Sequence, residues 1–141
     1  MGDRVETTTD AMAANADADA DAGADKAKPG GEELPLVTFA LFAYNQEKYI
    51  REAIEGAFSQ TYEPLEIILS DDCSRDDTHR IMCEMAAGYR GHHRVLVRRN
   101  EINLGIGRHV NAAIGDSTGQ FIVMAAGDDV SLPDRTRIMV E

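Results

Sequence analysis

The chain has 141 residues and a formal net charge of −11, from 14 Lys and Arg against 25 Asp and Glu. This length predicts one domain. The acidic charge argues against a nucleic-acid partner, which needs clustered Lys and Arg, and favours bound divalent cations. The longest uninterrupted apolar run spans only residues 39–43, or 36–43 if Thr38 is allowed, whereas a transmembrane helix needs roughly 20 residues. No secretion signal is recognisable, so we expect a cytoplasmic protein, either free or peripheral at the inner membrane face.

Residues 1–34 form a region of their own, with nine Asp and Glu against three Lys and Arg. Residues 11–25, AMAANADADADAGAD, alternate Ala with Asp and contain almost no large apolar side chain. Such a segment cannot bury enough surface to offset its ordering entropy. We predict a disordered, solvated tail over 1–34, with an acidic interaction tail as the alternative, and a folded domain over 35–141.

From residue 35 onward, patterns typical of strands alternate with patterns typical of helices. Residues 36–42 are almost continuously apolar, as expected of a strand buried on both faces in a parallel sheet. Further strands are predicted at 65–69, 95–97 and 121–124. A helix is predicted after the first strand because one face there is apolar. That face comprises Tyr49, Ile50, Ala53, Ile54, Ala57 and Phe58.

Two more helices complete the predicted pattern. Ser74 and Asp77 are spaced as a capping box, which predicts a helix that begins near Arg75. The third helix is predicted at 107–114. Its inward-facing residues are expected to be Ile106, Val110, Ala113 and Ile114. The β-α-β-α-β-α-β order predicts a mostly parallel, Rossmann-like α/β sheet with helices on both faces.

Polar residues follow each predicted strand, at the edge of the sheet where ligands of parallel sheets bind. They are Tyr44 and Asn45, Asp71 and Asp72, Asn100 and Asn103, and Asp128 and Asp129. Carboxylates gathered at one edge repel each other unless a cation offsets their charge. Mg²⁺ or Mn²⁺ takes oxygen ligands and is often shared with a substrate phosphate. The sequence therefore predicts a site for a metal and a diphosphate, without a Walker or dinucleotide-binding glycine motif.

Simpler interpretations of the same residues stay open. Asp71 and Asp72 are also typical of an Asx turn before a helix, and Asp128 and Asp129 of a loop cap. The four histidines are expected on loops or helix surfaces, with His109 at the surface or half-buried. Cys73 and Cys83 match no zinc spacing or disulfide framework, and we expect both to be free, buried thiols.

Residues 36–135 resemble the N-terminal half of the catalytic domain of family 2 glycosyltransferases, which have the GT-A fold. The resemblance rests on an ordered set of short motifs. They are VTFALFAYN (37–45), SQTY (59–62), EIILSDDCSRDDT (66–78), Asn100, Asn103-Leu104-Gly105, Asn111, GQFI (119–122), and Asp128-Asp129 followed by Pro133. No one of these motifs is specific, but their order over about a hundred residues is.

The resemblance implies metal-assisted transfer of a sugar from a nucleotide-diphosphate sugar, most simply a UDP-sugar, to a hydroxyl of a glycan, lipid or other acceptor, with inversion. Tyr44, with Asn45 beside it, would flank the nucleobase, and Asp72, with Asp71 beside it, would accept a hydrogen bond from a base N–H. Asp128 would contact the ribose or the metal, and Asp129 would hold Mg²⁺ or Mn²⁺. Arg108 would pair with a phosphate oxygen.

The chain departs from the family pattern in several respects, of which two bear on the site. Among the others, Cys73 and Asp77 replace usual glycines and Gln120 replaces a usual acid. Ala126 occupies the first position of the usual Asp-x-Asp triplet. In the family, the acceptor site and the catalytic base lie beyond the metal motif, so we expect a GT-A domain truncated after that motif and identify no catalytic residue. The alternative is a nucleotide-sugar-binding module without turnover. A phospho-acceptor receiver domain is disfavoured because Arg98, Arg99 and Asn100 follow the third strand, where it needs a lone Asp.

Overall fold

The computed structural model describes residues 33–141, so the predicted disordered tail lies outside the described residues except for its last two positions. Strands and helices alternate along the chain. The elements are β1 (Val37–Ala43), α2 (Ile50–Phe58), β2 (Leu65–Asp71), α3 (Thr78–Gly88), β3 (Arg94–Arg99), α4 (Ile106–Gly115), β4 (Phe121–Ala126) and α5 (Arg135–Val140). None of these helices has the length and apolarity that a membrane crossing requires.

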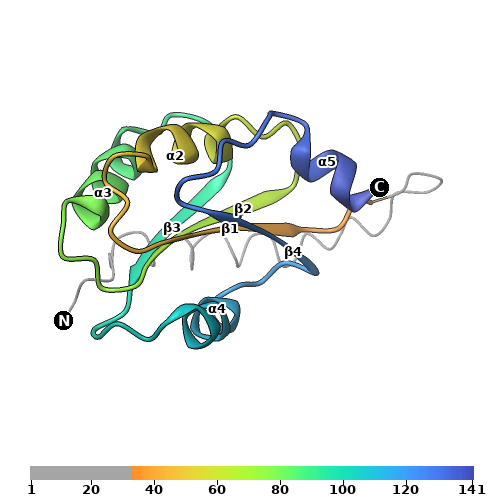
Figure 1. The fold of residues 1–141 in the computed structure, drawn as a ribbon. Helices are drawn as coiled ribbons and strands as arrows, with labels where there is room; N and C mark the ends of the chain where they lie inside the picture. The colour runs from red at the N-terminus through yellow and green to blue at the C-terminus, as the bar shows by residue number, and fades with distance from the viewer. Residues whose placement is uncertain (1–32) are drawn as a thin grey trace.

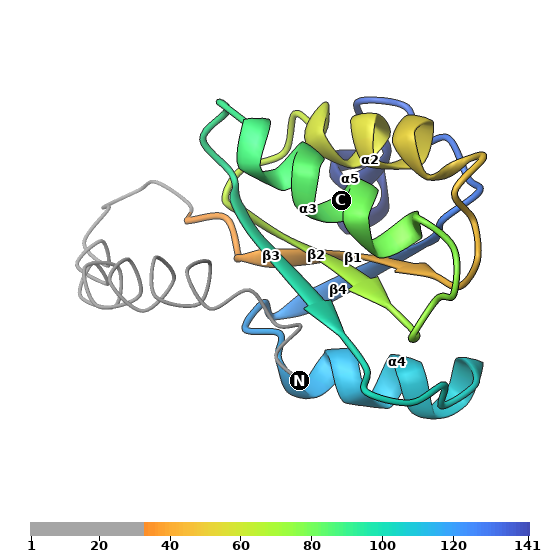
Figure 2. The same cartoon turned by 90° about the vertical axis from the view of Figure 1, so that its left-hand side faces the viewer.

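The four strands form one parallel sheet in the order β3-β2-β1-β4, which confirms the predicted α/β class. The chain moves outward from β1 to β3 and then crosses back to place β4 on the other side of β1. Right-handed crossovers in opposite directions put their helices on opposite faces. Accordingly, α2 and α3 cover one face together with α5, and α4 covers the other (Figures 1 and 2).

The two faces of the sheet are buried differently. On the face of α2 and α3, a large apolar cluster includes Phe39, Leu41, Ile54, Ile67 and Met82, all without measurable exposure. Among the described residues, the apolar cluster toward α4 is smaller, with Ala40, Phe42 and Ala113 as buried members and Val110 and Ile122 packed against it. The position of α4 therefore depends more on polar contacts than that of α2.

The predicted orientation of α4 is wrong in part. Ala113 is buried as expected, but Ile106 is 72% exposed and Ile114 is 42% exposed. The residue buried in their place is His109, one turn before Ala113. A polar residue took an inward position because the sheet offers it hydrogen-bonding partners there, which the apolar pattern does not register.

The predicted start of α3 is also wrong. The helix begins at Thr78, with Asp77 at the N-cap position and no side-chain capping bond. The Ser74 hydroxyl is occupied elsewhere, since it donates to an Asp71 carboxylate oxygen and accepts the backbone N–H of Asn45 at 2.7 Å. The capping box does not form because Asp71, three residues before it, and Asn45, on the loop after β1, hold the Ser74 hydroxyl in the loop after β2.

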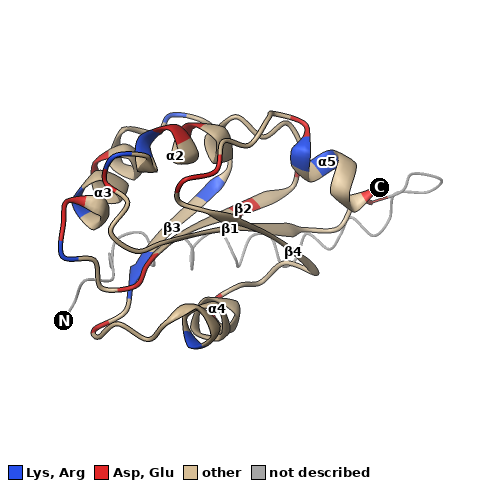
Figure 3. Ribbon diagram, viewed as in Figure 1, with Lys and Arg blue, Asp and Glu red and all other residues tan. Residues whose placement is uncertain are grey.

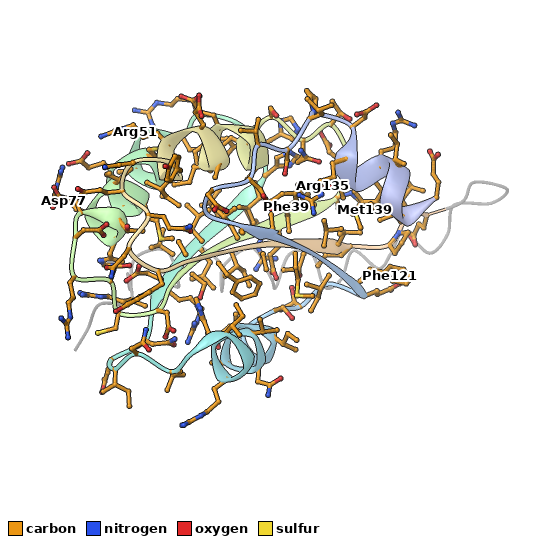
Figure 4. The ribbon with its side chains drawn as sticks, viewed as in Figure 1. Phe39, Arg51, Asp77, Phe121, Arg135 and Met139 are labelled. Atoms are coloured by element: carbon orange, nitrogen blue, oxygen red, sulfur yellow. The ribbon has the colours of Figure 1, made fainter. Side chains whose placement is uncertain are left out.

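The segment after β4 is fastened to α2 by the buried side chain of Gln60. Its amide nitrogen donates to the carbonyl oxygens of Gly56 at 3.0 Å and Leu132 at 2.8 Å, and its amide oxygen accepts from the backbone and hydroxyl of Thr136. A Cβ at Gly56 would lie 2.8 Å from the Ser131 carbonyl oxygen, so glycine permits this close approach. Nearby, Arg135 lies over the Phe39 ring, 5.9 Å from its centroid (Figure 4).

Replacement of Gln60 by Leu should therefore destabilise the domain. The substitution leaves the Thr136 N–H and hydroxyl without their acceptor, and unpaired buried groups cost about 1–3 kcal/mol each. The Gly56 and Leu132 carbonyl groups keep a second donor, the Ser59 hydroxyl and the Arg135 N–H. We expect the free energy of unfolding in urea to fall by about 2–4 kcal/mol. Gln120→Leu is the matched control, because Gln120 is exposed and should change stability little. Equal effects of the two substitutions would contradict this account of the loop.

Candidate functional site

A cleft of about 460 Å³ opens where the carboxyl ends of β1 and β4 meet the start of α4. This is the point at which the strand order reverses, because β2 and β4 lie on opposite sides of β1. Ligands of open parallel sheets bind at such reversals. The cleft is lined by Phe42, Ala43, Tyr44, Gln46, Asp72, Asn103, Gly105, Ile106, His109, Ala126 and Asp128.

Four of the polar residues predicted at the strand ends line this cleft: Tyr44, Asp72, Asn103 and Asp128. Tyr44 follows β1 directly, and its side chain is 42% exposed, which leaves an aromatic surface available to a ligand. Asp128 follows β4 and is exposed. Asp129 lines a neighbouring pocket instead, and its carboxylate accepts the Ala126 N–H at 3.3 Å, as in a loop cap.

The Asp72 carboxylate is only 3% exposed and joins β2 to the segment that precedes α4. One oxygen accepts from the Asn100 amide at 2.7 Å and the Leu104 N–H at 2.8 Å. The other accepts from the Asn103 amide at 3.1 Å and the Gly105 N–H at 2.9 Å. A carboxylate has about four acceptor positions. Asp72 therefore has its hydrogen-bonding capacity filled within the protein.

Glycine at position 105 is required by this arrangement. Its φ of 85° lies in the left-handed region, which residues with a Cβ rarely adopt. That conformation turns the chain so that the backbone N–H groups of Leu104 and Gly105 both reach Asp72 just before α4 begins. The loop and the carboxylate together fix where α4 starts.

Asp71 and Asn45 hold neighbouring loops together and do not line the cleft. Asp71 is fully buried, accepts the Ser74 N–H at 2.8 Å, and lies 3.4 Å from the Arg99 guanidinium. Asn45 accepts the Arg75 N–H at 2.8 Å and thereby joins the loop after β1 to the loop after β2. The polar residues predicted at the strand ends thus divide into those that face the cleft and those that support it.

A buried network of hydrogen bonds lies behind the cleft, and the sequence analysis did not predict it. Arg98 donates to the Asp116 carboxylate at 2.8 Å, to the Asn100 amide oxygen at 2.9 Å and to the Ser70 hydroxyl at 2.7 Å. The Ser70 hydroxyl in turn lies 2.7 Å from Nε2 of His109. The one signal of this network in the sequence was His109, which lies one turn before Ala113, a residue predicted to face the sheet.

The electrostatics of His109 follow from this setting. Burial lowers the pKa of its imidazole; the Asp72 and Asp71 carboxylates oppose that shift, and the Arg98 guanidinium reinforces it. The ring is therefore neutral at neutral pH. The helices differ in charge: α2 and α3 carry both acidic and basic residues, α5 carries Arg135 and Arg137, and α4 carries only Arg108 (Figure 3).

The remaining candidate residues do not line the cleft. Arg108 is exposed on α4 and is not among the lining residues. Cys73 and Cys83 form no disulfide within residues 33–141, and both are half-buried rather than buried as predicted. His92 pairs with the Glu63 carboxylate on an exposed loop.

The side chains that could bind a metal here suit only one kind of site, a hydrated cation shared with a substrate phosphate. Within residues 33–141, no cluster of three or more His, Cys, Asp or Glu side chains is placed to hold an ion. Asp128 and Asp129 are exposed neighbours, which suits Mg²⁺ or Mn²⁺ that keeps several waters and shares a substrate phosphate. The cleft has two carboxylates and no Lys or Arg among its lining residues. A diphosphate bound there would need a cation to offset the repulsion.

Similar proteins extend well beyond the length of this chain. The chain is 35% identical over 113 residues to the succinoglycan biosynthesis protein ExoO of Rhizobium meliloti, which covers 80% of this chain and 31% of ExoO. The structure of S. aureus TarS 1–349 in complex with UDP matches with a TM-score of 0.62 and 26% identity, over 73% of this chain and 30% of TarS. The chain thus spans about a third of each of these relatives.

A more distant structural match shares the fold. Mannosyltransferase PcManGT from Pyrobaculum calidifontis, in complex with GDP-Man and Mn²⁺, matches with a TM-score of 0.67 at 22% identity, over 85% of this chain and 36% of PcManGT. The sequence model of the family described as Glycosyl transferase family 2 matches residues 38–141, which is most of the chain. The chain therefore belongs to glycosyl transferase family 2.

Proposed function

We propose that this chain binds the donor of a glycosyl transfer, a nucleotide-diphosphate sugar, in the cleft between β1, β4 and α4. The observation that carries the proposal is the placement of an exposed aromatic residue and an exposed carboxylate in one cleft at the strand reversal. In the complete enzyme, the sugar would pass to a hydroxyl of a glycan, lipid or other acceptor, with inversion at the anomeric carbon.

Each lining residue has a role that its chemistry supports. Tyr44 offers an aromatic face on which a nucleobase can stack. Asp128, which lines the cleft, would hold Mg²⁺ or Mn²⁺, and Asp129 would support the same loop through its bond to the Ala126 N–H. A bound cation would neutralise the charge that develops on the nucleoside diphosphate as it leaves. The structures of TarS with UDP and of PcManGT with GDP-Man and Mn²⁺ support this choice of ligands.

For Asp72 we propose a positioning role in place of the predicted bond to a base N–H. Its four hydrogen bonds to the segment before α4 leave no acceptor position free for a ligand. Asp71 and Asn45 would likewise act through the loops they join. Arg108, on the helix that borders the cleft, stays a candidate for a phosphate contact, and no residue is assigned as catalytic base.

The binding proposal is tested by calorimetric titration of the chain with UDP, with and without Mn²⁺. We expect binding that strengthens with Mn²⁺, because the lining residues offer no other positive charge to the diphosphate. Asp128→Asn should weaken the Mn²⁺-dependent binding by more than about tenfold.

Asp129→Asn is the matched variant one residue away. It should weaken the same binding less, because its carboxylate lies in the neighbouring pocket. Loss of the Mn²⁺ effect in Asp129→Asn alone would assign the metal to Asp129 instead. UDP binding that ignores both the metal and the two substitutions would overturn the metal site.

The positioning role of Asp72 gives a second prediction. Asp72→Asn places an amide N–H₂ against backbone N–H donors, so at least one of them is left unpaired at a cost of about 1–3 kcal/mol. Urea unfolding should show this loss of stability, and UDP binding should weaken in parallel. Asp128→Asn is the control and should retain wild-type stability. Unchanged stability of Asp72→Asn with lost UDP binding would indicate direct contact with the base.

A binding module without turnover is the alternative, and it is favoured by the absence of any assigned base within residues 33–141. A measurement of UDP-sugar hydrolysis by this chain distinguishes a binding module from an active enzyme. We expect binding without turnover at an ordinary enzymatic rate, because the attacking hydroxyl needs a base within hydrogen-bonding reach. Turnover at such a rate would show that a catalytic base is present in this chain.

A further inference from the structure

His109 is a buried titratable residue in the cleft wall that the proposed function leaves unused. Its side chain is 2% exposed, and its ring packs edge-on against Phe42, with the ring centroids 5.0 Å apart. Phe42 and His109 both line the cleft. Each imidazole nitrogen bonds to the protein, to a ligand or to water in the cleft, and Nδ1 is not among the enclosed polar atoms that lack a partner in the described residues.

The hydrogen bonds around Ser70 decide which imidazole nitrogen carries the proton. Arg98 can only donate, so the Ser70 hydroxyl oxygen accepts from it at 2.7 Å. Ser70 is fully buried, and its own proton needs an acceptor. The acceptor found for it in the described part of the chain is Nε2 of His109, at 2.7 Å. Nε2 is therefore the unprotonated nitrogen, and the neutral ring carries its hydrogen on Nδ1.

Nδ1 has no hydrogen-bond partner among residues 33–141. The one hydrogen bond of the His109 side chain is that between Nε2 and Ser70. The arrangement thus leaves an N–H donor without a partner on a residue that lines the cleft. A donor in this position is suited to a ligand oxygen that binds there.

We propose that Nδ1–H of His109 donates a hydrogen bond to a neutral oxygen, carbonyl or hydroxyl, of the nucleoside bound in the cleft; this rests on the proposed function. The network that orients the ring is anchored at the end of β2, through Ser70, whereas the carboxylate proposed for the cation follows β4. Because the ring is neutral, it suits an uncharged oxygen better than a phosphate. His109 would thus recognise the nucleoside rather than the diphosphate.

Two substitutions of His109 test the roles of its two ring nitrogens separately. His109→Gln can keep a polar atom near the Nε2 position for Ser70, but it lacks a donor at the Nδ1 position. His109→Asn keeps a donor near Nδ1 and loses the contact with Ser70. We expect His109→Gln to weaken both UDP and uridine binding, measured without metal, by about three- to tenfold, the usual effect of one hydrogen bond. His109→Asn should weaken them less.

Equal weakening of uridine and UDP supports the nucleoside contact. A loss confined to UDP would move the contact to the diphosphate, and wild-type affinity in a folded His109→Gln variant would overturn the proposal. If the wild-type chain binds neither UDP nor GDP, the proposed function itself fails, which is a distinct result.

Nuclear magnetic resonance of the wild-type chain provides a test that does not depend on a variant folding. Long-range ¹H–¹⁵N correlation of the imidazole should show the hydrogen on Nδ1, and addition of uridine should shift the Nδ1 resonance more than that of Nε2. A hydrogen on Nε2, or an Nδ1 resonance that uridine leaves unchanged, would contradict the proposal.

Discussion

The cleft depends on the four hydrogen bonds that the Asp72 carboxylate accepts from the segment before α4. Among residues 33–141, α4 is the one helix on its face of the sheet, and it contributes only Ala113 and the partly buried Val110 to the small apolar cluster there. Hydrophobic burial of that size specifies position weakly, whereas hydrogen bonds to a buried carboxylate are strong and directional. The start of α4, and with it one wall of the cleft, is therefore set by the Asp72 carboxylate at the end of β2.

The polar character of this face continues deeper into the sheet. Glu66 is almost fully buried on β2 and accepts hydrogen bonds from Thr38 on β1 and from Thr118 before β4. The chain from Arg98 through Ser70 to His109 lies further along the same strand. Polar networks of this kind are costly if any member is unsatisfied, so they hold the backbone to one geometry. The apolar face provides stability, and the polar face provides the arrangement that a ligand site requires.

The sequence predicted the architecture well and the site in part. Alternating strand and helix patterns were sufficient for the parallel sheet, because burial on both faces of a strand leaves a strong local signal. Asn100 and Asn103 were predicted at the same edge of the sheet as Asp72, but not as its partners. Its other two partners, Leu104 and Gly105, were not predictable, since they lie about thirty residues further along the chain and bind through backbone groups that no side-chain motif reveals. The burial of His109 was not predicted for a similar reason. Its inward orientation is favoured by Ser70, which lies on β2. Local patterns report burial, and long-range hydrogen bonds decide which polar residues face the cleft.

The central claim is that a nucleoside diphosphate binds between β1, β4 and α4. Amide ¹H–¹⁵N spectra of the chain, recorded during titration with UDP and Mg²⁺, test it most directly. The account predicts that the largest shifts occur at Tyr44, Gly105, His109 and Asp128, which line one cleft although they are distant in sequence. Shifts concentrated instead at residues 129–139, around the neighbouring pocket, or spread evenly over the surface would contradict it.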